Sequence, residues 1–182
     1  KMVAITHIDL KPDQDYLFVV GNSRSGTTMM GRIFGGHPDV FMLNELHFFE
    51  ELWSPADRGK TCSPDEAMQL LLKLLVNQND PFYDRGDPQR YQQEAETIMN
   101  ALPRKPYSKI ELFKAFLLFE TLRHGKKIPC LQTPRNVYYL KEIFEFFPNC
   151  RVIHMVRDPR DILLSQKRRW KQRSLGAAHI TR

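Results

Sequence analysis

The stretch FVVGNSRSGTT, residues 18–28, decides the fold of this chain. An apolar run ends at a glycine, and a loop of small polar residues with one arginine follows. A second glycine and two threonines then open a helical pattern. This order predicts a strand, a phosphate-binding loop and a helix, because backbone N–H groups and a helix N-terminus together hold an anion. Thr27 stands where nucleotide triphosphatases have a lysine, so the residues for magnesium–triphosphate chemistry are incomplete.

A second segment, residues 151–165, has the same plan. An apolar strand pattern ends at residue 156, and Asp158 and Pro159 then supply an N-cap and a first helical position. Arg157 is therefore expected at the carboxyl end of a strand. Ser165 is expected about two turns into the next helix.

Together these segments resemble the two nucleotide-binding loops of sulfotransferases that use PAPS (3′-phosphoadenosine 5′-phosphosulfate). In the branch with an RSGTT loop, that loop holds the 5′-phosphosulfate, and an arginine and a serine eight residues later hold the 3′-phosphate. GHPDV at 36–40, followed by Asn44 and Glu45, is similar to the tyrosylprotein and carbohydrate branches, and bacterial members are similar too. The resemblance covers about residues 15–60 and 128–170.

The resemblance implies a donor site made of two groups of residues. The first group holds the 5′-phosphosulfate: Arg24, Ser25, Gly26, Thr27 and Thr28. The second group holds the 3′-phosphate: Arg157, Ser165 and Arg169. Two alternatives stay open, since Thr27 or Thr28 could serve only to cap the helix and Arg169 could be an exposed helix charge.

The implied reaction moves a sulfuryl group from PAPS to a hydroxyl or amine and leaves PAP (3′-phosphoadenosine 5′-phosphate). By analogy with phosphoryl transfer, an in-line step needs mainly positioning and charge stabilisation. We expect no metal, and we expect Arg24 to stabilise the leaving oxygen. A general base must take the acceptor's proton. Glu45 is the first candidate and His47 the second. Glu50 is a more distant candidate, and we interpret it rather as a solvated helix residue.

Two features depart from the family pattern. Many relatives have a lysine directly before a Thr-Pro pair that follows a strand. In this chain the pair is Thr133-Pro134, and Gln132 stands in the place of the lysine. Relatives also continue well past the 3′-phosphate motif, so we interpret residues 1–182 as a single sulfotransferase domain that lacks its C-terminal part. A P-loop nucleotide kinase and a catalytically impaired nucleotide-binding relative remain alternatives.

Composition agrees with a globular enzyme: 42% of the residues are hydrophobic, 26% are charged, and the net charge is +6. No apolar run approaches the roughly 20 residues of a membrane span. Five of the basic residues lie within 167–173, which favours a solvated helix face or a rim that attracts anions. Nucleic acid is not expected as a partner, because no aromatic platform or known motif accompanies the charge.

The expected acceptor is a small molecule, a carbohydrate or a protein side chain. The expected compartment is the cytoplasm for a bacterial protein, or the Golgi lumen if an N-terminal anchor has been removed.

The hydrophobic patterns alternate between strands and helices. Strands are predicted at 16–20, 40–43, 127–131 and 150–156. Helices are predicted at 28–35, 46–53, 63–76, 87–102, 108–123 and 136–147. The fold class is therefore α/β: a P-loop-like three-layer fold with a central parallel sheet flanked by helices. Ligands bind such folds beyond the carboxyl ends of the strands.

Overall fold

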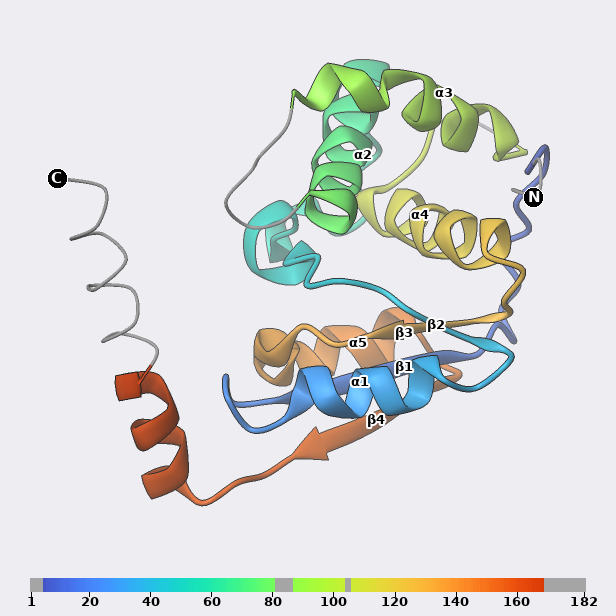
Figure 1. Cartoon of the computed structure of the whole chain (residues 1–182). Helices are drawn as coiled ribbons and strands as arrows, with labels where there is room; N and C mark the ends of the chain where they lie inside the picture. Colours follow the sequence, from blue (N-terminus) through green and yellow to red (C-terminus); the bar gives the residue numbers. More distant parts are fainter. Residues whose placement is uncertain (1–4, 81–86, 104–105, 169–182) are drawn as a thin grey trace, which may run out of the picture.

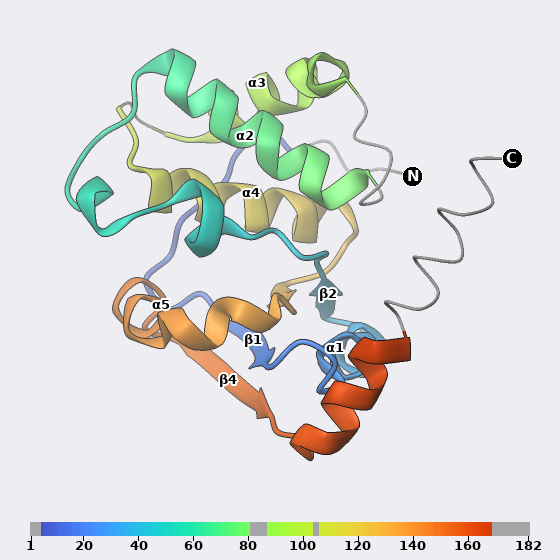
Figure 2. The same cartoon turned by 90° about the vertical axis from the view of Figure 1, so that its left-hand side faces the viewer.

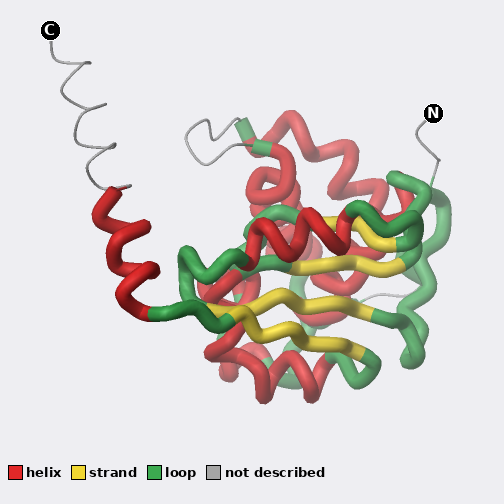
Figure 3. The backbone as a smooth tube through the Cα atoms, turned by 60° about the horizontal axis from the view of Figure 1, so that its bottom comes forward, coloured by secondary structure: helices red, strands yellow, loops and turns green. Residues whose placement is uncertain are grey.

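The computed structural model describes residues 5–80, 87–103 and 106–168. Its centre is a four-stranded sheet in the order β2-β3-β1-β4, and every neighbouring pair is parallel. The strands are β1 (Tyr16–Gly21), β2 (Val40–Met42), β3 (Ile128–Leu131) and β4 (Cys150–Met155). Figure 3 shows the four strands side by side, with the loops after β1 and β4 at the same edge.

Strand β1 is buried along its whole length, as is typical of a central strand in a parallel sheet. Its side chains alternate between two faces. Phe18 and Val20 belong to the larger hydrophobic core, whereas Leu17 and Val19 belong to a smaller one that includes Met30 of helix α1 (Thr27–Gly35). Each face of the sheet is therefore covered by its own helical layer.

Helix α1 covers one face of the sheet, and α4 (Lys109–Arg123) and α5 (Leu140–Phe146) cover the other (Figure 1). Helices α2 (Pro64–Asn79) and α3 (Gln92–Ala101) pack on α4, outside the three layers (Figure 2). A further helix begins at residue 159 and runs to the last described residue, 168. Its Ser165 contacts Arg24 in the loop that precedes α1. The α/β class with a parallel sheet flanked by helices is confirmed.

Capping boxes open α2 at Ser63 and α4 at Ser108, as the sequence predicts. Three predicted helices are wrong in part. The segment predicted at 136–147 is a 3₁₀ helix, η4 (Pro134–Tyr139), followed by the short α5. The segment predicted at 46–53 is a single π-helical turn, η1 (Phe48–Leu52), and α3 is preceded by the 3₁₀ turn η3 (Pro88–Tyr91).

Local sequence explains two of these differences. A proline opens both η3 and η4, where its missing N–H costs nothing. In η4 the next residues include a valine and two tyrosines, which are weaker helix formers than leucine or alanine. A 3₁₀ helix, η2 (Pro55–Asp57), lies between η1 and α2. No helix of the described residues has the length and apolar character needed to cross a membrane.

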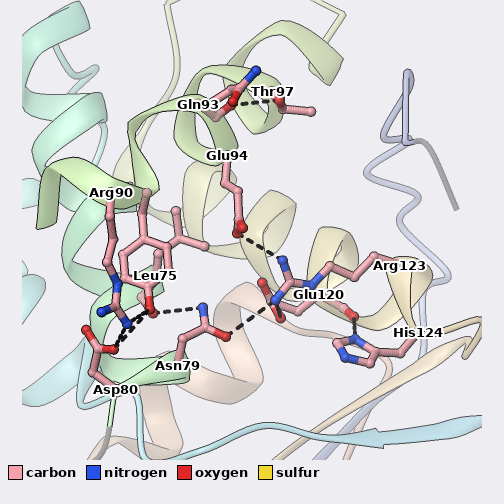
Figure 4. Close-up of polar contacts among 11 residues, drawn as sticks. Leu75, Asn79, Asp80, Arg90, Gln93, Glu94, Thr97, Glu120, Arg123 and His124 are labelled. Carbon is pink, nitrogen blue, oxygen red and sulfur yellow. Dashed lines mark hydrogen bonds and ion pairs between the residues drawn. The ribbon is translucent and has the colours of Figure 1, made fainter. Parts of the chain in front are cut away.

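A buried ionic cluster joins α3 to α4 (Figure 4). The Glu120 side chain is 0% exposed, and its Oε2 lies 2.9 Å from Nη2 of Arg123. Arg123 also donates through Nη1 to Oε2 of Glu94 at 2.9 Å. Neither Glu120 oxygen has a hydrogen bond of good geometry to any described residue. Burial raises the pKa of Glu120 to about 7, against the opposing effect of Arg123.

Candidate active site

A cavity of about 410 Å³ opens at the carboxyl edge of the sheet. This volume lies within the range of roughly 300–1,000 Å³ that is usual for ligand pockets. The cavity is lined by residues from the loop after β1, the segment after β2, the turn after β3 and the segment after β4: Ser23, Arg24, Gly26, Thr27, Thr28, Glu45, Pro134, Arg157 and Ser165. Seven of these nine are among the residues that the sequence predicts for the site.

The loop after β1 is held tightly against β4. Gly21 has a φ of 150°, and a Cβ atom there would lie 2.4 Å from the carbonyl oxygen of Met155. Gly26, at the N-cap of α1, has a φ of 100°, which favours glycine. Arg24 also has a positive φ, of 73°. Non-glycine residues adopt that conformation rarely, so the loop has a fixed and strained shape.

Two segments that are far apart in the sequence meet at this loop. Nε of Arg24 donates to Oγ of Ser165 at 2.9 Å, across 141 residues of sequence. Nη1 of Arg157 donates to the backbone oxygen of Arg24 at 3.3 Å, across 133 residues. Arg157 also lies 3.7 Å from a carboxylate oxygen of Asp161, one turn further on. The wall of the cavity therefore carries two guanidinium groups close to the N-terminus of α1.

Glu45 lines the same cavity from the segment after β2. The residue that follows it is anchored on both sides. The backbone N–H of Leu46 donates to Oγ1 of Thr133 at 3.2 Å, and Nδ2 of Asn77 donates to the backbone oxygen of Leu46 at 2.9 Å. These bonds tie the Glu45 segment to the turn after β3 and to α2. The carboxylate therefore sits on a fixed backbone.

Not every predicted residue reaches the cavity. Within the described part of the chain, Ser25 and His47 are not among its lining residues. Ser25 is buried, and its Oγ donates to the backbone oxygen of Asn22 at 2.6 Å, which closes the loop on itself. His47 lies behind Glu45, with Nε2 at 3.7 Å from Oε2 of that carboxylate. Arg169 lies outside the described residues.

Gln132 lies beneath α1 and is 3% exposed. Its Oε1 accepts a hydrogen bond from Oγ1 of Thr28 at 3.3 Å, and its side chain packs against the position of Gly31. The amide therefore orients a hydroxyl of the cavity wall.

The sequence interpretation missed two lining residues, Ser23 and Pro134. Ser23 lies inside the loop motif, and Pro134 lies three residues after the end of β3 at Leu131. Both residues lie in or beside motifs that the sequence already shows, and this proximity could have marked them as lining residues. Among the residues that the structure describes, no group of three or more His, Cys, Asp and Glu side chains is arranged to hold a metal ion.

The cavity lies beyond the carboxyl ends of a parallel α/β sheet, between a glycine-containing loop after β1 and an arginine after β4, which is where folds of this class bind their ligands. The chain belongs to the sulfotransferase family, whose family model matches residues 16–181.

The chain is also similar to individual proteins, two of which are named sulfotransferases. The chain is 25% identical over 179 residues to carbohydrate sulfotransferase 5 of Homo sapiens (85% of this chain, 42% of the relative). It is 24% identical over 176 residues to human carbohydrate sulfotransferase 6 (84% and 43%). It is also 26% identical over 170 residues to an uncharacterized protein of Aquifex aeolicus (strain VF5) (93% and 18%). The chain thus spans less than half the length of each of these relatives.

Proposed function

We propose that this chain carries the donor site of a PAPS-dependent sulfotransferase and transfers a sulfuryl group to a hydroxyl-bearing acceptor. One observation carries the proposal: the Arg24 loop and the Arg157–Ser165 segment form one cavity wall, and Arg24 is in direct contact with both Arg157 and Ser165. Two cations and an α-helix N-terminus at one cavity suit a ligand with two separate anionic groups.

The roles of the residues follow from their places in the wall. The backbone around Gly26 and the hydroxyls of Thr27 and Thr28 would hold the 5′-phosphosulfate. Arg157 and Ser165 would hold the 3′-phosphate, with the guanidinium giving two parallel hydrogen bonds. PAPS itself supplies the sulfuryl group and a phosphate leaving group.

Arg24 and Glu45 would serve the transfer step. As the acceptor oxygen bonds to sulfur, the bridging S–O bond breaks and the bridging oxygen keeps its electron pair. Arg24 stabilises the charge that develops there. Glu45 takes the proton of the acceptor hydroxyl, since a general base is needed at neutral pH.

The acceptor class is argued from the two human relatives, which are named carbohydrate sulfotransferases. We infer a sugar hydroxyl as the first acceptor to test. Small-molecule hydroxyls, amines and protein side chains complete the screen.

Calorimetric titration of the chain tests the donor site. We expect PAP to bind in the presence of EDTA, and to bind more tightly than AMP by about 10- to 100-fold, because hydrogen bonds to a charged group contribute roughly 1.5–3 kcal/mol. Arg157→Ala should remove this difference. Arg160→Ala is the matched control, because Arg160 is exposed and is paired with Asp158. Equal affinity for PAP and AMP would overturn the assignment of the 3′-phosphate site.

Sulfuryl transfer from labelled PAPS to the acceptor screen tests the reaction. The presence of Gln132 instead of the family lysine favours one second candidate, a relative that binds the nucleotide but turns over slowly or not at all. PAP binding without transfer to any acceptor class would support that candidate. Magnesium-dependent phosphoryl transfer from ATP would instead support the kinase alternative.

A further inference from the structure

A line of charged side chains runs from the cavity wall toward the surface. It begins at Glu45, whose Oε2 lies 3.7 Å from Nε2 of His47. The other ring nitrogen of His47, Nδ1, lies 3.0 Å from Oε2 of Glu50. The second oxygen of Glu50 pairs with the guanidinium of Arg135, next to the lining residue Pro134. The sequence interpretation treats Glu50 as a solvated helix residue, but its side chain is only 19% exposed.

The contacts of Glu50 decide which nitrogen of His47 carries a proton. Burial alone would raise the pKa of Glu50, but the hydrogen bonds from His47 and Arg135 outweigh it and hold the pKa below its ordinary value. An ionised carboxylate can only accept hydrogen bonds, so Nδ1 of His47 must be the donor. In the neutral ring, the lone pair is then on Nε2.

Nε2 of His47 faces Glu45. Two acceptors that approach within 3.7 Å repel each other unless a proton lies between them. At 3.7 Å the two atoms are outside hydrogen-bonding distance, and a shift of about 1 Å of either side chain brings them close enough to share one proton.

The backbone keeps His47 in this position. Its φ is 53°, in the left-handed region that a non-glycine residue rarely adopts. The following residues, Phe48 and Phe49, are each 2% exposed. The ring of Phe48 stacks on that of Phe113, with the ring centroids 3.8 Å apart. This packing fixes η1 on the core, so the backbone that carries the imidazole has little freedom to move, and the bond to Glu50 then sets the orientation of the ring. Strained residues held by surrounding packing are common at functional sites.

We propose that Glu50 is a positioning residue, which together with Arg135 holds His47 in the Nδ1–H form so that Nε2 receives the proton that Glu45 takes from the acceptor. This inference rests on the proposed function. The acceptor O–H bond breaks and its proton passes to Glu45. It then moves from Glu45 to Nε2, which restores the carboxylate and leaves an imidazolium hydrogen-bonded to Glu50. Solvent removes the proton afterwards.

Kinetics of Glu50→Gln test the role in turnover. Because glutamine keeps the shape of glutamate but can present an N–H to Nδ1, we expect kcat to fall by up to about 10²-fold, the cost of a misplaced group. The affinity for PAP should be unchanged. Glu50→Asp should restore part of the rate, and the pH profile of kcat should shift in Glu50→Gln. Glu51→Gln is the matched control, since Glu51 is the exposed neighbour in the same turn.

Nitrogen-15 NMR of the imidazoles tests the tautomer without any need for turnover. The chain has six histidines, and loss of one signal set in His47→Asn identifies the resonances of His47. We expect the Nδ1–H form in the wild type, a mixture in Glu50→Gln, and no change in Glu51→Gln.

The two measurements separate the inference from the proposed function. If Glu50→Gln leaves the tautomer as in the wild type, the positioning role is wrong, whatever the activity of the chain. If the tautomer changes while kcat and its pH profile do not, the proton path through His47 is wrong. A chain that fails to transfer sulfuryl groups refutes the proposed function, and the NMR result then still decides whether Glu50 orients His47.

Discussion

The buried carboxyl group of Glu120 predicts an unusual pH dependence of stability. In the folded chain its pKa is raised to about 7 from the ordinary 4.5, mainly because burial disfavours the charged form. Arg123 opposes this shift, and the carboxylate of Glu94 adds to it. Between these two pKa values the folded chain binds a proton that the unfolded chain has released. The free energy of unfolding must therefore fall as the pH rises through this window.

The size of the effect follows from the shift. Each pKa unit corresponds to about 1.4 kcal/mol, so between the two pKa values of Glu120 the free energy of unfolding changes by ~3 kcal/mol. Between pH 5.5 and pH 8, where ordinary carboxylates are already ionised, Glu120 should lower the free energy of unfolding by about 2 kcal/mol. For a domain of this size, that corresponds to a fall in Tm of roughly 4–8 °C.

Urea unfolding at several pH values checks this expectation. The histidines also titrate in this window, so the measured quantity is the difference between the wild type and Glu120→Gln. The variant cannot ionise, and it should lose about 2 kcal/mol of the pH dependence. Glu96→Gln is the control, because Glu96 is an exposed carboxylate of α3 that does not contribute to the raised pKa of Glu120. A Glu120→Gln variant with the same pH dependence as the wild type would refute the reasoning.

Three further substitutions test the site. Glu45→Gln should lower kcat by roughly 10²–10⁴-fold at saturating donor, with unchanged PAP affinity in calorimetry; a near-normal rate, alongside an inactive His47→Asn, would assign the base to His47. Gln132→Lys places an ammonium group at a 3% exposed position and should cost about 1–3 kcal/mol in urea unfolding; an equally stable and faster variant would mean that the lysine reaches the cavity. Gly21→Ala places a Cβ atom against the β4 backbone, so it should weaken PAP binding and lower the free energy of unfolding. Gly125→Ala is the control, because the added atom there meets open space, and it should cost only ~1 kcal/mol. Equal losses in the two glycine variants would show that the close approach of the loop to β4 is not important.

The sequence alone determined the strand–loop–helix units and the edge of the sheet where the site lies. The signals for these features are local: a buried apolar run, the two glycines of the loop at 21–26, and the capping boxes at Ser63 and Ser108. Each acts through backbone groups a few residues away, so a short window of sequence contains all the information. The parallel order of the strands then brings Arg24 and Arg157 to the same edge.

The tertiary structure decided where individual side chains point. The sequence does not reveal that Ser25 turns into its own loop, that Gln132 supports Thr28 from beneath α1, or that Glu50 contacts His47. The contact between Gln132 and Thr28 joins segments more than 100 residues apart. The other two contacts each span three residues, and each includes a residue with a positive φ, Arg24 or His47, which the residue types do not reveal. A residue type and its spacing specify what chemistry a side chain can perform. Which atoms it meets is determined by packing, because a side chain takes the rotamer that its distant neighbours leave open.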